Sequence, residues 1–116
     1  MQFIIYATDD KTAPGTPMTM EQLAALGKLT EDSKKAGVLI TTGALQPTGT
    51  RVLLADGKFT VTDGPFIEAK ELMGGFAVIR ANSLEEAIEY AKQFRSIVGD
   101  GESEIVPIWG PDDSPA

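Results

Sequence analysis

The alternation of apolar and polar residues along the chain predicts a single domain in which strands and helices alternate. Four segments are short, rich in β-branched and aromatic residues, and bounded by turn residues, as strands are. They are residues 2–7, 38–45, 75–81 and 103–109. Residues 2–7 and 75–81 are apolar at both alternating sets of positions, which is typical of strands that are buried on both faces.

Two segments instead repeat apolar residues every three or four positions, which predicts amphipathic helices. The first follows Thr19, which with Gln22 forms a capping-box pattern, and it ends at Gly37. The second follows Ser83, for which Glu86 is the corresponding partner. The predicted buried faces are Leu23, Leu26, Leu29, Ser33 and Ala36 in the first helix, and Leu84, Ala87, Ile88, Ala91 and Phe94 in the second.

A β-hairpin is predicted between the second and third of these strands. Asp56 and Gly57 form a two-residue turn, so Leu54 faces Phe59 and Val52 faces Val61 across the two arms. In this register those four residues share an apolar face, and the opposite face is mostly polar. The same alternation places Asp63 on the apolar face, so its carboxylate is predicted to point inward.

Without the hairpin the order is βαββαβ, the ferredoxin-like plan of an α+β protein. Pro107 has no backbone N–H for a ladder, so the last strand is predicted at a sheet edge. With both helices on one face, the other apolar face of the sheet would be exposed in a monomer. We therefore predict a two-fold homodimer that packs through this sheet face. Residues 1–109 form the domain, and residues 110–116 are expected to be a disordered tail.

Composition narrows the classes of function. The net charge of −7 disfavours binding to nucleic acid and to anionic membranes. The chain has neither an apolar run that could span a bilayer nor a signal-peptide pattern, and its 116 residues contain no cysteine, so we expect a cytoplasmic protein. The absence of histidine removes the commonest general base and metal ligand. No cofactor or metal is predicted.

The segment 62–75 concentrates the candidate chemistry. Pro65 stiffens the turn that follows Asp63, and an acidic and basic cluster comes next. Asp63 either caps backbone N–H groups of its own turn or acts as a general base or polar anchor in a cavity. The cluster of Glu68, Lys70 and Glu71 is either a solvated group of ion pairs or part of a site, and the conformation of residues 67–73 stays open. The carboxylate spacing matches no metal-ligand pattern, and no P-loop signature follows the glycine pair at 74–75.

The run Asp63-Gly64-Pro65-Phe66, followed by Glu68, Lys70-Glu71 and Gly74-Gly75, resembles the signature of the DGPF group of the YCII-related family. The resemblance extends to Ala36-Gly37-Val38-Leu39, to Gly43-Ala44-Leu45-Gln46-Pro47 and to Ser83-Leu84-Glu85-Glu86-Ala87. It implies a ferredoxin-like fold that dimerises as an α/β barrel. Some relatives are associated with sigma-factor-like regulators, and a few members of the wider superfamily act on lactones or chlorinated ring-cleavage products. A histidine–aspartate pair suspected in some members cannot operate here, because the chain has no histidine.

Three functions follow as hypotheses. The first is a homodimeric small-molecule-binding or sensing domain, with its cavity between the sheet and the partner chain. The second is an enzyme of proton transfer on a small organic acid or lactone, with Asp63 as base and Lys70 or Arg51 stabilising an anion. The third is a regulatory module that binds another protein. The predicted binding residues are Tyr6, Gln46, Gly64, Pro65, Phe66, Glu68, Lys70 and Trp109.

Overall fold

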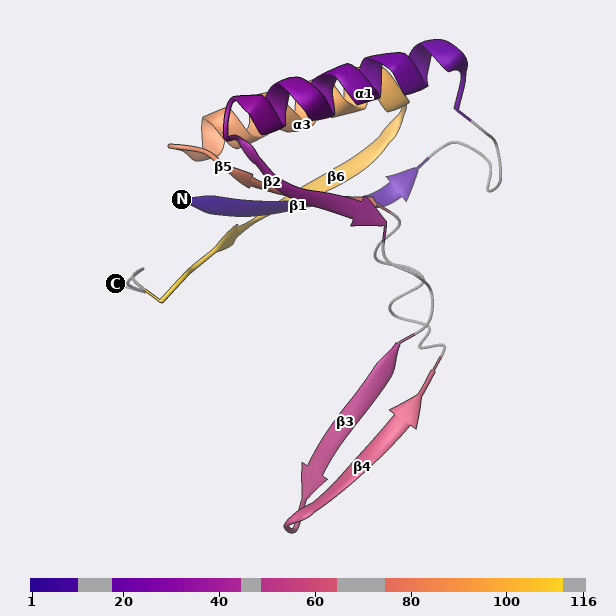
Figure 1. Cartoon of the computed structure of the whole chain (residues 1–116), viewed down its shortest axis with the longest axis vertical. Helices are drawn as coiled ribbons and strands as arrows, with labels where there is room; N and C mark the ends of the chain where they lie inside the picture. The colour runs from indigo at the N-terminus through magenta and orange to yellow at the C-terminus, as the bar shows by residue number, and fades with distance from the viewer. Residues whose placement is uncertain (11–17, 45–48, 65–74, 112–116) are drawn as a thin grey trace.

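The fold is α+β and ferredoxin-like, with a four-stranded antiparallel sheet in the order β2-β5-β1-β6. A computed structural model describes residues 1–10, 18–44, 49–64 and 75–111. Figure 1 shows both helices on one side of the sheet. The elements are β1 (Gln2–Asp10), α1 (Met20–Lys35), β2 (Leu39–Ala44), β3 (Thr50–Ala55), β4 (Lys58–Asp63), β5 (Gly75–Arg80), α3 (Leu84–Val98) and β6 (Gly101–Ile108).

The N-termini of both helices are capped by the predicted residues. The Thr19 hydroxyl accepts from the backbone N–H of Gln22 at 3.0 Å, and the Gln22 side chain accepts from the Thr19 N–H at 2.8 Å. The second capping box is only half confirmed. Ser83 accepts from the Glu86 N–H at 3.3 Å, but the Glu86 carboxylate accepts from the N–H of Asn82 at 2.8 Å and not from that of Ser83.

The core lies between the sheet and α3. It consists of Phe3, Ile5, Leu39, Ile79, Ala81, Ala87 and Ala91. The small side chains of Ala87 and Ala91 bring α3 close to the central strands. The predicted burial is wrong for the isolated chain at Ala36, which is exposed, and at Leu23 and Leu84, which are 54% and 48% exposed. The two leucines belong to the first turn of their helix, where fewer neighbouring elements cover a side chain.

The strands agree with the prediction to within one residue except at the end of β1 and at the start of β6, which begins at Gly101 and not at Ser103. Strand β1 continues to Asp10, because after an irregularity between Ala7 and Asp9 it pairs further with β6. The prediction that the Pro107 strand is an edge strand is confirmed by the strand order. No helix within the described ranges is long and apolar enough to cross a membrane.

The hairpin β3–β4 forms a separate two-stranded sheet with the predicted register, in which Leu54 pairs with Phe59. Asp56 and Gly57 adopt positive φ angles of 50° and 77°, which suit a two-residue hairpin turn. In Figure 1 the hairpin extends away from the sheet on the side opposite the helices. The radius of gyration, 16.7 Å, accordingly exceeds the ~13 Å of a compact chain of this length.

Candidate functional site

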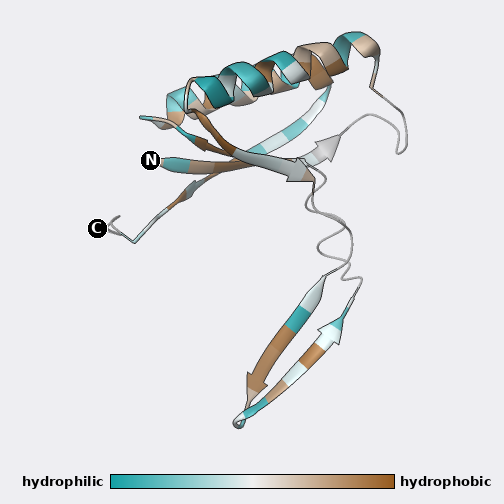
Figure 2. Cartoon of the chain, viewed as in Figure 1, coloured by the Kyte–Doolittle hydropathy of each residue, from teal (hydrophilic) through white to brown (hydrophobic). Residues whose placement is uncertain are grey.

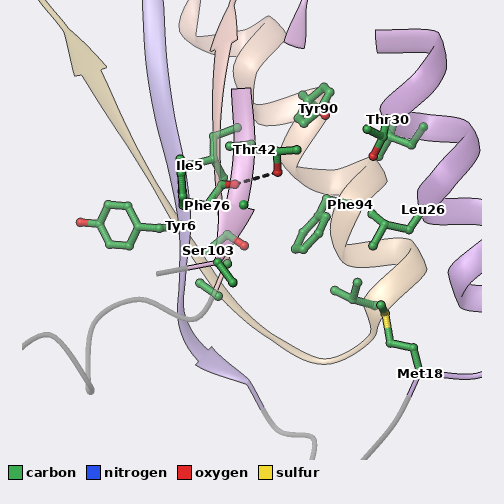
Figure 3. Close-up of a pocket in the computed structure, with 17 residues that line it drawn as sticks. Ile5, Tyr6, Met18, Leu26, Thr30, Thr42, Phe76, Tyr90, Phe94 and Ser103 are labelled. Atoms are coloured by element: carbon green, nitrogen blue, oxygen red, sulfur yellow. Dashed lines mark hydrogen bonds between the residues drawn. The ribbon is translucent and has the colours of Figure 1, made fainter. Parts of the chain in front are cut away.

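A pocket lies between the two helices and the sheet, and its volume is about 730 Å³ (Figure 3). Its lining includes Ala44 at the end of β2 and Gly75 at the start of β5. The chain therefore leaves the pocket wall, forms the hairpin, and returns to the same wall. The remaining lining residues are Ile5, Tyr6, Ala7, Met18, Leu26, Leu29, Thr30, Thr42, Gly43, Phe76, Ala77, Tyr90, Phe94, Val98 and Ser103.

The pocket walls are apolar and carry no charged side chain among these residues. Leu26 and Thr30 of α1 and Tyr90 and Phe94 of α3 face the sheet in Figure 3. Thr42 Oγ1 donates to the backbone carbonyl of Phe76 at 2.8 Å, so its hydroxyl oxygen can still accept a hydrogen bond. The arrangement can enclose an apolar group and offers a few hydroxyls to orient it.

Arg95 joins the end of α3 to the start of β6 at the edge of this pocket. Its Nε donates to the hydroxyl of Ser103 at 2.8 Å, and its terminal nitrogens donate to the carbonyls of Gly99 and Glu102 at 3.5 and 3.4 Å. The guanidinium carbon also lies 5.4 Å from the centroid of the Phe94 ring. These contacts fix two pocket residues, Ser103 and Phe94, relative to one another.

The comparisons with known proteins identify the family. The model of the YCII-related domain matches residues 1–110. The chain belongs to the YCII-related family. This confirms the family resemblance, whereas membership of the DGPF group stays a prediction. The comparison with curated proteins gave no match.

One solved structure similar to this YCII-related chain is that of 5-chloro-2-hydroxyhydroquinone dehydrochlorinase (TftG) from Burkholderia phenoliruptrix AC1100, in complex with 2,5-dihydroxybenzoquinone. The two share 17% identity at a TM-score of 0.47, over 95% of this chain and 94% of the other. Similarity at this level does not transfer the activity or the ligand of that enzyme to the present chain.

Among the predicted binding residues, Tyr6 belongs to the pocket lining of the YCII-related domain, although its ring points away from the helices (Figure 3). Its hydroxyl donates to the carboxylate of Glu104 at 2.6 Å. This hydrogen bond raises the pKa of Tyr6 above its usual value, and burial and the negative charge of Glu104 act in the same direction. Because its ring points away from the helices, the Tyr6 side chain lies on the sheet face opposite them, which we call the open face.

Asp63 and Gly64 stand at the base of the hairpin. Asp63 pairs with Thr50, as the predicted alternation requires, and its Oδ1 accepts from the Thr50 hydroxyl at 2.9 Å. The carboxylate is exposed in the isolated chain and is not among the residues that line the pocket. The N–H of Gly64 donates to the carbonyl of Gly49 at 2.7 Å and closes the hairpin.

The structure does not bring Trp109 together with Tyr6. Trp109 is 58% exposed and follows Ile108, which pairs with Gln2, whereas Tyr6 pairs with Glu104 further along the strand. The predicted site residues Gln46, Pro65, Phe66, Glu68 and Lys70 lie outside the described residues. Across the described ranges, no three acidic side chains come close enough to hold a metal ion.

The helical wall of the pocket is not apparent from the sequence. The periodicity of Leu26, Leu29 and Phe94 correctly indicates helix faces turned toward the sheet. The same periodicity arises whether such a face is packed solidly or lines a cavity. Only the spacing of the two helices from the strands distinguishes these cases.

Proposed function

We propose that this YCII-related domain binds a small, uncharged organic molecule in the pocket between the helices and the sheet. The supporting observation is a pocket of about 730 Å³ with no charged side chain among the described residues that line it, in a chain of net charge −7. This volume falls within the ~300–1,000 Å³ of small-molecule sites, which are mainly apolar with a few polar groups.

The composition of the walls favours a neutral ring over an organic acid. An anion transferred into this pocket would lose its hydration, and no lysine or arginine belongs to the described part of its lining to compensate. The ring of a neutral aromatic or alicyclic molecule would instead contact Phe94 and Tyr90, and a polar substituent on the ring could hydrogen-bond to the hydroxyl of Thr30 or Thr42.

We further propose that the domain is a homodimer that packs through the sheet face opposite the helices. Val78, Ile4 and Val106 are directly paired across β5, β1 and β6 on that face. Ile4 and Val78 are half-buried and Val106 is 36% exposed, so an apolar row crosses the sheet and no described element forms a layer over it. Light scattering on the purified protein would give twice the mass of one chain, and a single-chain mass across the measured concentrations contradicts the dimer.

The binding proposal is tested with two probes of the same ring skeleton. N-phenyl-1-naphthylamine is neutral, and 8-anilino-1-naphthalenesulfonate carries a sulfonate. Fluorescence titrations at high salt, where the net charge of the chain is screened, should give at least ~10-fold tighter binding of the neutral probe.

The Thr30→Phe variant locates the probe. Thr30 lines the pocket, so a phenyl ring at this position would occupy the space and weaken binding by about 10-fold or more. Thr60→Phe is the matched control, because Thr60 lies exposed on the hairpin and does not line the pocket. Equal affinities of Thr30→Phe and wild type, or equal affinities for the two probes, would refute the proposed site.

A further inference from the structure

The hairpin β3–β4 carries an apolar surface that no other described element covers. Val52, Leu54, Phe59 and Val61 share one face and are 67%, 59%, 72% and 65% exposed. Figure 2 shows hydrophobic stretches along both arms of the hairpin, which stands apart from the sheet. Every residue of the two strands is exposed.

A hairpin of this kind needs a further contact to persist in water, because an isolated two-stranded sheet is at best marginally stable. Its side chains are nevertheless those of a strand that packs on another layer, with β-branched and aromatic residues paired across the arms. Exposed apolar surface concentrated on one face in this way marks a contact with another macromolecule.

We propose that the apolar face of the hairpin docks on a second copy of this chain, as an arm that completes the dimer interface. This inference rests on the proposed dimer and is independent of ligand binding in the pocket. Each protomer would contribute its arm to the other by the same two-fold operation, so that the interface contains two equivalent arm contacts.

The area of the arm argues for a shared interface. Four side chains that are about two-thirds exposed offer on the order of 200–300 Å² of apolar surface. A stable interface needs roughly 800 Å² on each partner, so the arm cannot suffice alone. The open sheet face with Ile4, Val78 and Val106 supplies a second apolar surface in the same chain. A single dimer interface would therefore cover both the apolar face of the hairpin and the open face of the sheet.

The distribution of charge also favours a second copy. The two strands and their turn contain two basic residues, Arg51 and Lys58, and two acidic residues, Asp56 and Asp63. The hairpin is therefore neutral, and the net charge of −7 lies entirely outside it. Among the parts of a strongly acidic chain, a neutral and apolar arm meets the least repulsion from an identical acidic partner.

Two neighbouring leucines provide a matched pair of variants. Leu53 and Leu54 are 58% and 59% exposed, but they lie on opposite faces of the hairpin. Leu54→Thr removes apolar surface from the docking face, and Leu53→Thr makes the same chemical change on the other face. Threonine has a high strand propensity, so both variants should keep the hairpin.

Analytical ultracentrifugation of the full chain over a range of concentrations measures the dimer dissociation constant of each variant. We expect Leu54→Thr to raise it at least about 10-fold, because each dimer carries the change twice, and Leu53→Thr to change it less than about 3-fold. A dimer weakened equally by both variants, or by neither, overturns the docking of this face. A chain that is monomeric throughout overturns the dimer and the arm together, whereas probe binding reports on the pocket separately.

Hydrogen exchange of the wild-type chain provides a measurement without substitution. Amides of β3 and β4 should be protected at concentrations where the dimer forms and should lose protection on dilution, while those of the central strands β1 and β5 stay protected. Hairpin protection that is equal in monomer and dimer overturns the proposal, since the arm would then be covered from within its own chain or not at all.

Discussion

Replacing Ile79 by alanine should show how much the burial of this side chain in β5, a strand that forms part of the pocket wall, contributes to the free energy of unfolding. Ile79 is fully buried in β5 and lies opposite Phe3 of β1 and Leu39 of β2. The same strand carries Ala77, which lines the pocket. The change removes three carbon atoms, which at about 0.8 kcal/mol each contribute about 2.4 kcal/mol of lost transfer free energy.

The cavity left behind adds about 1 kcal/mol or more, because neighbouring strands and α3 can relax only partly. We therefore expect Ile79→Ala to lower the free energy of unfolding by about 3–4 kcal/mol. That is a large share of the ~5–15 kcal/mol that is typical of a domain, and it corresponds to a melting temperature lowered by more than about 10 °C.

Urea unfolding followed by far-ultraviolet circular dichroism measures this loss. Trp109 is a poor probe of the core, because it is 58% exposed after the end of β6. All variants are compared at one protein concentration, since association would shift the apparent stability. Ile40→Ala deletes the same atoms from a side chain that is 42% exposed, so its expected cost is about 1 kcal/mol. Equal losses for the two variants would refute the assigned core.

Two further predictions concern the helix cap and the open face of the sheet. Thr19→Ala should lower the free energy of unfolding by about 1 kcal/mol, because the Gln22 N–H loses its acceptor, while Thr19→Ser should retain most of it; a loss that serine does not restore would argue against capping. The raised pKa of Tyr6 makes its neutral form the stabilising one, so this contribution is present below the unfolded pKa near 10 and is lost as the pH rises through the higher folded value. Glu104→Gln should therefore shift one of the two tyrosine transitions in an ultraviolet absorbance titration to lower pH, and an unchanged titration would contradict the Tyr6–Glu104 hydrogen bond.

Local signals in the sequence were sufficient for most of the secondary structure. Thr19 and Gln22 have a capping geometry that depends only on residues three apart, and Asp56 and Gly57 set a turn that fixes the register of both arms. The edge position of β6 was predicted from Pro107 alone, because the missing backbone N–H is a property of that single residue. The exception at Glu86 is also local, because a glutamate side chain can reach either of two neighbouring N–H groups.

The binding surfaces required the tertiary structure. Composition and periodicity predicted that Phe94 and Leu26 face the sheet. The pocket that these residues line exists only because of the distance of α1 and α3 from the strands, which the sequence pattern does not set. The faces of Leu53 and Leu54 follow from the register predicted for the hairpin, but their exposed fractions of 58% and 59% depend on how the hairpin sits relative to the rest of the chain. The sequence by itself thus determined the elements, their order and the pairing within the hairpin, because each follows from short-range geometry. The pocket, whose described lining carries no charge, and the separation of the hairpin from the sheet were decided only by the packing of elements that are distant in the chain.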